Sequence, residues 1–65
     1  MNDRRSERVK ILRHNIKYAD IKIGDWKSAL QNSLEKDGQI NWHAVDMIEM
    51  YAERMGDWRR QLLEL

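Results

Sequence analysis

Residues 36–41 read Lys-Asp-Gly-Gln-Ile-Asn, and they carry the signals for the end of one helix and the start of another. Lys36 suits a helix C-terminus because its charge complements the helix dipole, and Gly38 suits the left-handed position just beyond it. Asn41 suits an N-cap because its side-chain oxygen can accept a hydrogen bond from the first turn of a helix. The stretch therefore predicts a turn between two helices.

Apolar residues recur in steps of three and four on both sides of this turn, which keeps one face of each helix apolar. The first stripe consists of Val9, Leu12, Ile16, Ala19, Ile23, Trp26 and Leu30, and the second of Ala44, Ile48, Tyr51, Met55, Trp58, Leu62 and Leu65. Strand formers are few, since the chain has no phenylalanine and no threonine. We predict an all-α helical hairpin with helices over about 4–36 and 41–63 and a turn at about 37–40.

The stripes are wider than a two-stranded seam needs, because further apolar residues flank them. The chain has 65 residues and no cysteine, so it has no disulfide to stabilise it. A lone core in a domain this small rarely supplies a comfortable margin of stability. We therefore predict that the single domain, residues 1–65, pairs with a second copy into a four-helix bundle. The predicted interface with that copy or with another partner comprises Ile11, Trp42, Val45, Met47 and Leu63.

A compact three-helix domain is the alternative. Glycine inside a helix costs about 1 kcal/mol relative to alanine, so breaks near Gly24 and Gly38 would separate helices near 3–22, 25–36 and 41–63. Against a break near Gly24, the apolar spacing passes through that position without slipping. Both versions are all-α.

Charge differs between the two arms, although the net charge of the chain is only +1. Residues 1–37 hold nine Lys and Arg against six Asp and Glu, a net of +3, and residues 38–65 hold three against five, a net of −2. Antiparallel arms of opposite sign attract each other, with about 0–1 kcal/mol for each exposed pair. The charges therefore agree with a hairpin.

The first helix begins with a basic segment that could contact a nucleic-acid backbone. Its residues are Arg4, Arg5, Arg8, Lys10, Arg13 and Lys17. A sequence pI of about 8.1 is below the value above about 9 that is typical of a dedicated binder. Nucleic-acid binding by a small regulator is therefore the alternative function.

Signals for catalysis are nearly absent. None of the serines lies in a nucleophile motif, and no glycine-rich phosphate loop is present. His14 and His43 are far apart in a hairpin, where His43 should face the region of Ser33. We expect no catalytic residue, no metal site, no cofactor and no enzymatic activity.

The remaining function class is interaction with another macromolecule. An exposed tryptophan is a common interface hot spot, and Trp42 lies off the second apolar stripe. No apolar run approaches the roughly 20 residues of a membrane-spanning helix, and the charged N-terminal residues do not resemble a signal segment. We predict a small, non-enzymatic, cytoplasmic regulator that oligomerises and binds a protein partner, with no membrane contact.

Overall fold

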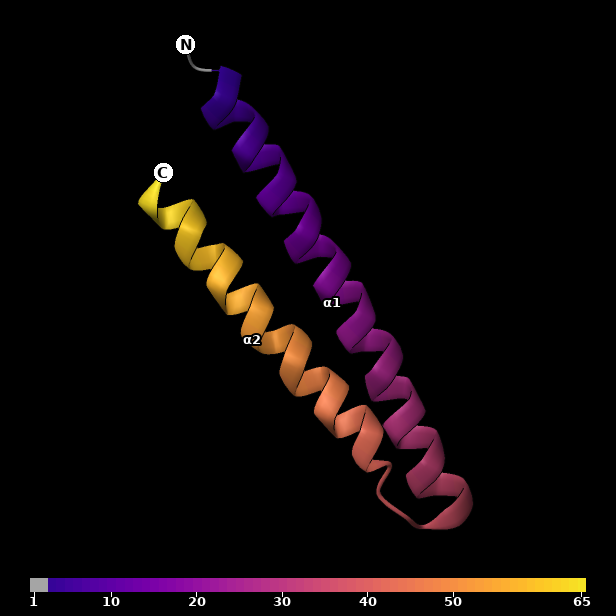
Figure 1. Ribbon diagram of the computed structural model, residues 1–65. Coiled ribbons are helices and arrows are strands. Elements are labelled where there is room, and N and C mark those ends of the chain that lie inside the picture. Colours follow the sequence, from indigo (N-terminus) through magenta and orange to yellow (C-terminus); the bar gives the residue numbers. More distant parts are fainter. Residues whose placement is uncertain (1–2) are drawn as a thin grey trace.

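The protein folds as an antiparallel pair of long helices in a computed structural model that describes residues 3–65 (Figure 1). Helix α1 spans Asp3–Asp37 and helix α2 spans Trp42–Glu64. The two helices lie side by side in a rod 55 Å long and 14 × 12 Å across. The predicted all-α hairpin is confirmed, and the predicted helix bounds differ from the observed ones by one residue at each end.

The turn between the helices forms as the sequence predicts. Gly38 has a φ of 66°, the only positive φ among the described residues, and its N–H donates to the carbonyl oxygen of Leu34 at 3.0 Å. This is the left-handed arrangement that commonly ends a helix. Asn41 caps α2, because its Oδ1 accepts a hydrogen bond from the N–H of Ala44 at 3.1 Å. Both signals read from the sequence are therefore confirmed.

Helix α1 is continuous through Gly24, so the three-helix alternative is wrong. The backbone there is helical, and the apolar stripe before and after Gly24 packs against the same partner helix. The helix tolerates this glycine because its cost is about 1 kcal/mol, which is small beside the packing of a 35-residue helix. Gly56 lies inside α2 in the same way.

Little of the molecule is buried. Among residues 4–65 only four side chains are buried, and they are Leu12, Ala19, Ile23 and Ala44. Two of these are alanines, so the buried apolar surface is small for two helices of this length. Within the described chain, neither helix has an apolar segment long enough to cross a membrane.

Three pairs of side chains across the two helices define their register. The pairs are Arg8 with Gln61, Tyr18 with Tyr51, and Trp26 with His43. From the first pair to the last, steps of 10 and 8 residues forward along α1 are matched by equal steps backward along α2. The helices are therefore paired in a constant antiparallel register over most of the length of α2.

The connecting segment runs back along α1 instead of closing a tight turn (Figure 1). Ser33 Oγ donates a hydrogen bond to the carbonyl oxygen of Gln39 at 3.0 Å, which holds the segment against the last turns of α1. Consequently His43 contacts Trp26, with ring centroids 5.2 Å apart, and the expectation that it faces Ser33 is wrong. The end of α1 extends past the first residue of α2.

Candidate interaction surfaces

One side of the hairpin carries a row of aromatic and sulfur-containing side chains, which we call the aromatic flank. The contacts of Tyr18 with Tyr51 and of Trp26 with His43 locate it on both helices. Ile11 joins it seven positions before Tyr18, and Met47 and Met50 join it four and seven positions after His43, because such steps return to the same side of a helix. The aromatic flank comprises Ile11, Tyr18, Trp26, His43, Met47, Met50 and Tyr51.

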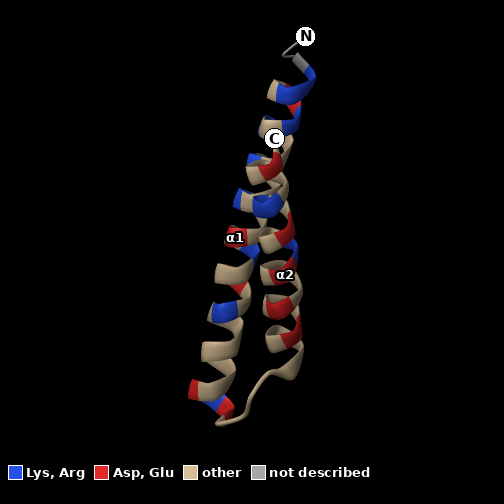
Figure 2. Ribbon diagram, turned by 90° about the vertical axis from the view of Figure 1, so that its left-hand side faces the viewer, with Lys and Arg blue, Asp and Glu red and all other residues tan. Residues whose placement is uncertain are grey.

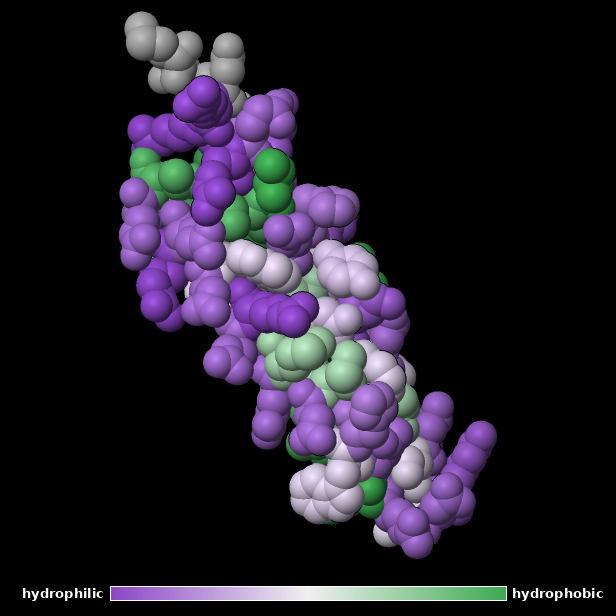
Figure 3. All heavy atoms as spheres, in the orientation of Figure 1, coloured by the Kyte–Doolittle hydropathy of each residue, from purple (hydrophilic) through white to green (hydrophobic). Residues whose placement is uncertain are grey.

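The aromatic flank is open to solvent over much of its length. Ile11 is 56% exposed and Tyr18 is 47% exposed, while Met47 and Met50 are half-buried. The ammonium of Lys22 lies 5.5 Å from the centre of the Tyr18 ring, so it partly covers that ring by a cation–π contact. On the face seen in Figure 3, apolar and near-neutral side chains extend along the molecule between hydrophilic margins.

The five interface residues predicted from the sequence do not lie on one side. Ile11 and Met47 belong to the aromatic flank, but Val45 is two positions from Met47 and so points about 160° away from it around α2. Leu63 follows Val45 by five helical turns and shares its side, where it is 88% exposed. Trp42 is 66% exposed at the first residue of α2.

The interface predicted from the sequence omits five members of the aromatic flank, which are Tyr18, Trp26, His43, Met50 and Tyr51. Tyr18 and Met50 had a signal in the sequence, since Tyr18 follows Ile11 by seven residues and Met50 follows Met47 by three. Such steps place residues on one side of a helix. The prediction treated the apolar residues beside the two stripes as one surface, although Val45 and Leu63 lie on a different side of the hairpin from Ile11 and Met47.

The charges of the hairpin separate along its length. We call residues 4–19 and 54–65 the terminal end, and residues 20–53 the turn end. The terminal end holds nine Lys and Arg against three Asp and Glu, and the turn end holds three against seven. The net charges over residues 4–65 are therefore +6 and −4. Figure 2 shows the basic residues gathered near the termini and acidic residues along α2 towards the turn.

Charge is thus separated more strongly along the length of the hairpin than between its two arms, which is the separation that the sequence alone suggests. Helix α2 contributes Arg54, Arg59 and Arg60 to the terminal end, next to the basic segment of α1. In residues 4–65 the ion pairs are Lys10 with Glu7 at 4.0 Å and Arg60 with Asp57 at 3.2 Å, and both lie within one helix. The attraction expected between the arms is therefore not expressed as an ion pair between them.

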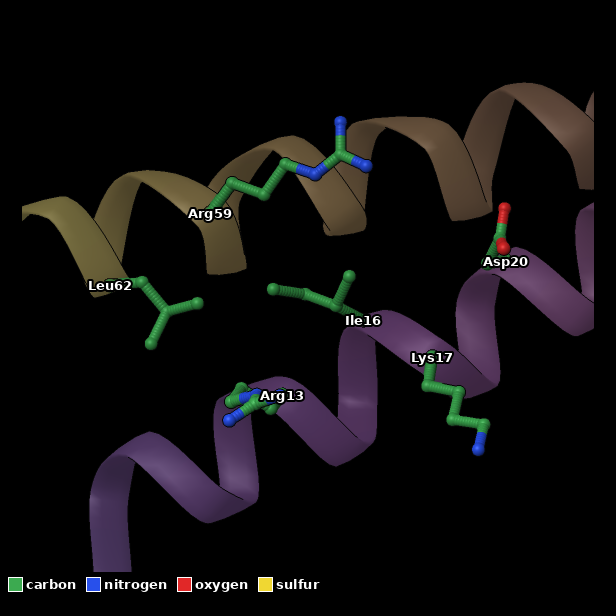
Figure 4. Close-up of a pocket in the computed structure, with 6 residues that line it drawn as sticks. All are labelled: Arg13, Ile16, Lys17, Asp20, Arg59 and Leu62. Atoms are coloured by element: carbon green, nitrogen blue, oxygen red, sulfur yellow. The ribbon is translucent and has the colours of Figure 1, made fainter. Parts of the chain in front are cut away.

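A groove of about 420 Å³ lies between the helices, and all of its lining residues except Asp20 belong to the terminal end. Ile16 and Leu62 point towards each other and form its apolar floor, while Lys17 is directed away from α2 (Figure 4). Three cationic side chains and one carboxylate surround the floor, so the groove favours an anion. We call this the basic groove, and its lining residues are Arg13, Ile16, Lys17, Asp20, Arg59 and Leu62.

The six basic residues predicted as nucleic-acid contacts are all exposed, but they are spread around α1. Arg13 and Lys17 line the basic groove. Arg4 and Arg8 line a smaller hollow of about 290 Å³ with Glu7 and Ile11, and Arg8 Nη2 also donates to Gln61 Oε1 at 2.8 Å. The two that lie outside both hollows are Arg5 and Lys10.

Comparison of the chain with protein-family models, with curated proteins and with solved structures gives no match. Among the described residues, no cluster of His, Asp and Glu is arranged to hold a metal ion. The described residues therefore offer three candidate surfaces for function, which are the aromatic flank, the exposed residues near the turn and the basic groove.

Proposed function

We propose that this protein is a small non-enzymatic regulator that self-associates through the aromatic flank and binds a protein partner. The observation that carries the proposal is the amount of surface left exposed. A compact monomer of 7.9 kDa exposes about 4,400 Å², whereas this hairpin exposes 5409 Å². The excess, roughly 1,000 Å², is comparable to the roughly 800 Å² that each partner buries in a standard interface.

The aromatic flank is the side best suited to cover that excess. Two ring pairs bridge the helices on this side, Tyr18 with Tyr51 and Trp26 with His43, and a second hairpin packed over them would place them in the interior of a four-helix bundle. Methionine adapts its shape to a facing surface, and exposed aromatic rings contribute strongly to association. Covering the flank with a second copy would bury Ile11 and Tyr18, which a single hairpin leaves about half exposed.

Surface near the turn remains for a protein partner. Leu34, Ile40 and Trp42 are 46%, 47% and 66% exposed and lie on or beside the connecting segment. Trp42 is also outside the aromatic flank, so a second copy packed there would leave it accessible. We assign partner binding to these three residues.

Analytical ultracentrifugation over a dilution series tests the self-association, with matched variants to locate the surface. Ile11→Glu places a charge on the aromatic flank and should weaken the dimer by at least about tenfold in Kd, since removing a carboxylate from water is costly even with Arg4 and Arg8 beside it. Leu63→Glu adds the same charge at the terminal end, but on the side of α2 that points away from the aromatic flank. The Kd of its dimer should therefore match that of the wild type.

A chain that remains monomeric at all concentrations, with an unfolding midpoint independent of concentration, would contradict the proposal. Equal weakening by both glutamate variants would instead remove the aromatic flank as the interface. For the partner, Trp42→Ser should abolish capture of the bound protein from a host lysate without changing the mass of the dimer. Capture unaffected by this substitution would refute the role of Trp42.

The basic groove favours nucleic-acid binding as a second candidate function. Its three cationic side chains come from both helices and are accompanied by only one carboxylate, that of Asp20. The groove therefore suits a phosphate backbone. Binding of fluorescein-labelled DNA and RNA should then fall with salt. Arg13→Gln with Arg59→Gln should lower the slope of log K against log salt by about 1.4–1.8.

The matched control is Lys27→Gln with Lys36→Gln, which removes the same charge at the turn end. This control should leave the slope unchanged. Equal losses in both double variants would show that only overall charge matters, and would remove the groove as a binding site.

A further inference from the structure

We propose that the second copy packs on the aromatic flank head to tail, with the basic terminal end of each hairpin beside the acidic turn end of the other. This inference rests on the proposed self-association and names its geometry. The observation behind it is the separation of charge along the rod, +6 at the terminal end and −4 at the turn end over residues 4–65.

Two-fold symmetry, the usual arrangement of a homodimer, leaves two ways to lay one hairpin on another. An axis parallel to the rod places like ends together, so a terminal end of net charge +6 lies beside another of the same charge. An axis perpendicular to the rod places each basic end beside an acidic end. Helices of two copies in contact are about 8–10 Å apart, which is about one Debye length at physiological salt, so the choice matters energetically.

Charged residues beside the aromatic flank agree in sum with the second arrangement, since Arg4, Glu7 and Arg8 at the terminal end give +1, and Lys22, Asp25 and Asp46 at the turn end give −1. At the terminal end, Arg8 contacts Gln61 across the helices, and Arg4 lies one helical turn before it. At the turn end, Asp46 follows His43 by three residues and Asp25 follows Tyr18 by seven, so each returns to the side of that ring. Head-to-tail packing brings the two arginines of one copy towards the two aspartates of the other, at both ends of the dimer.

The paired tyrosines Tyr18 and Tyr51 lie near the centre of such a dimer. Along the hairpin, this contact lies between two others. Arg8 contacts Gln61 on the side of the termini, and Trp26 contacts His43 on the side of the turn. A two-fold axis that crosses the rod near this contact places the four tyrosine rings of two copies together. Aromatic rings at the centre of an interface are typical of residues that dominate binding.

Distances between single spin labels on two copies test this arrangement directly, and the absence of native cysteine makes the labelling clean. Ser6→Cys labels the terminal end and Asn32→Cys labels the turn end; both positions are exposed, and Asn32 lies on the Asp25 side of α1 beyond the segment that pairs with α2. The two positions are 26 residues apart along α1, or about 39 Å. Three samples are compared by pulsed dipolar spectroscopy, namely each variant alone and an equal mixture.

Head-to-tail packing predicts long distances of about 40 Å within each single-variant sample, and a shorter distance, below about 25 Å, only in the mixture. Short distances in the single-variant samples would overturn the proposal in favour of like ends together. Absence of any intermolecular signal at concentrations where the label leaves folding intact would instead refute self-association itself, so the two failures are distinguishable.

Charge reversal supplies a second readout. Asp25→Lys with Asp46→Lys should raise the Kd of the homodimer at least about tenfold, because lysines then face arginines at both ends. Mixing this variant with Arg4→Glu and Arg8→Glu chains should restore wild-type affinity in the heterodimer. If like ends met, the aspartate variant would only exchange Asp facing Asp for Lys facing Lys, and an unchanged Kd would contradict the proposal.

Discussion

The ring of Tyr18 in α1 meets the ring of Tyr51 in α2 edge to face, with centroids 6.3 Å apart and an angle of 71° between the planes. This geometry is favourable because the positive edge of one ring faces the negative face of the other. The pair links the two helices and at the same time forms part of the aromatic flank. It therefore contributes both to the hairpin and to the proposed dimer.

A double-mutant cycle of Tyr18→Leu and Tyr51→Leu measures the first contribution. Leucine preserves apolar contact but removes the ring edge, so the coupling energy should be about 0.5–1.5 kcal/mol. The free energy of unfolding in urea, taken at one chain concentration for all four proteins, gives this value. Additive effects of the two substitutions would mean that the rings do not interact in solution.

Alanine at either internal glycine should stabilise the protein. At Gly24 and Gly56, apart from the adjoining residues and the nearby backbone of the same helix, no described atom lies within 4 Å of the place where a Cβ would stand, and both positions are helical. Gly24→Ala and Gly56→Ala should each raise the free energy of unfolding by about 0.5–1 kcal/mol, since alanine loses less conformational entropy. Thermal unfolding followed by circular dichroism tests this, and a lowered midpoint would contradict it.

The same substitution in the turn should have the opposite sign. Gly38 has a φ of 66°, where an L-residue with a Cβ is strained, although space for the Cβ is open. Gly38→Ala should therefore lower the free energy of unfolding by about 1–2 kcal/mol. Gly38→Asn should be milder, because asparagine tolerates the left-handed conformation better. Equal effects of both substitutions would argue against backbone strain as the cause.

The cap of α2 can be tested separately. Asn41 Oδ1 accepts the N–H of Ala44, one of the donors that the first turn of a helix leaves free. Asn41→Ala should destabilise the protein by about 1 kcal/mol, while Asn41→Asp should keep the hydrogen bond and add a favourable charge at the helix N-terminus. Urea unfolding of both variants distinguishes loss of the cap from a general intolerance at this position.

Local rules explain why the sequence predicted the helices and the turn. The capping by Asn41 and the left-handed Gly38 depend only on neighbouring residues, and the apolar spacing depends only on helix geometry. The continuity of α1 through Gly24 follows from the same spacing. These features needed no knowledge of how the two helices pair.

The register and the charge pattern could not be predicted in the same way. The path of the connecting segment decides which residue of α1 faces His43, and that path depends on the hydrogen bond between Ser33 and Gln39. Without the register, charge could only be summed arm by arm. Placing Arg59 beside Arg13 requires the folded hairpin, so neither the basic groove nor the charged ends were evident beforehand.

The constant register also gives the hairpin a direction of folding. The two members of the pair near the turn, Trp26 and His43, are 17 residues apart in sequence, whereas Arg8 and Gln61 are 53 apart. Closing the longer loop first would cost about 1 kcal/mol more in chain entropy. We therefore expect the helices to zip from the turn towards the termini, so that substitutions at Trp26 slow folding and those at Gln61 mainly speed unfolding. The chain then brings its most positively charged segments together last, after the remaining contacts are in place to hold them.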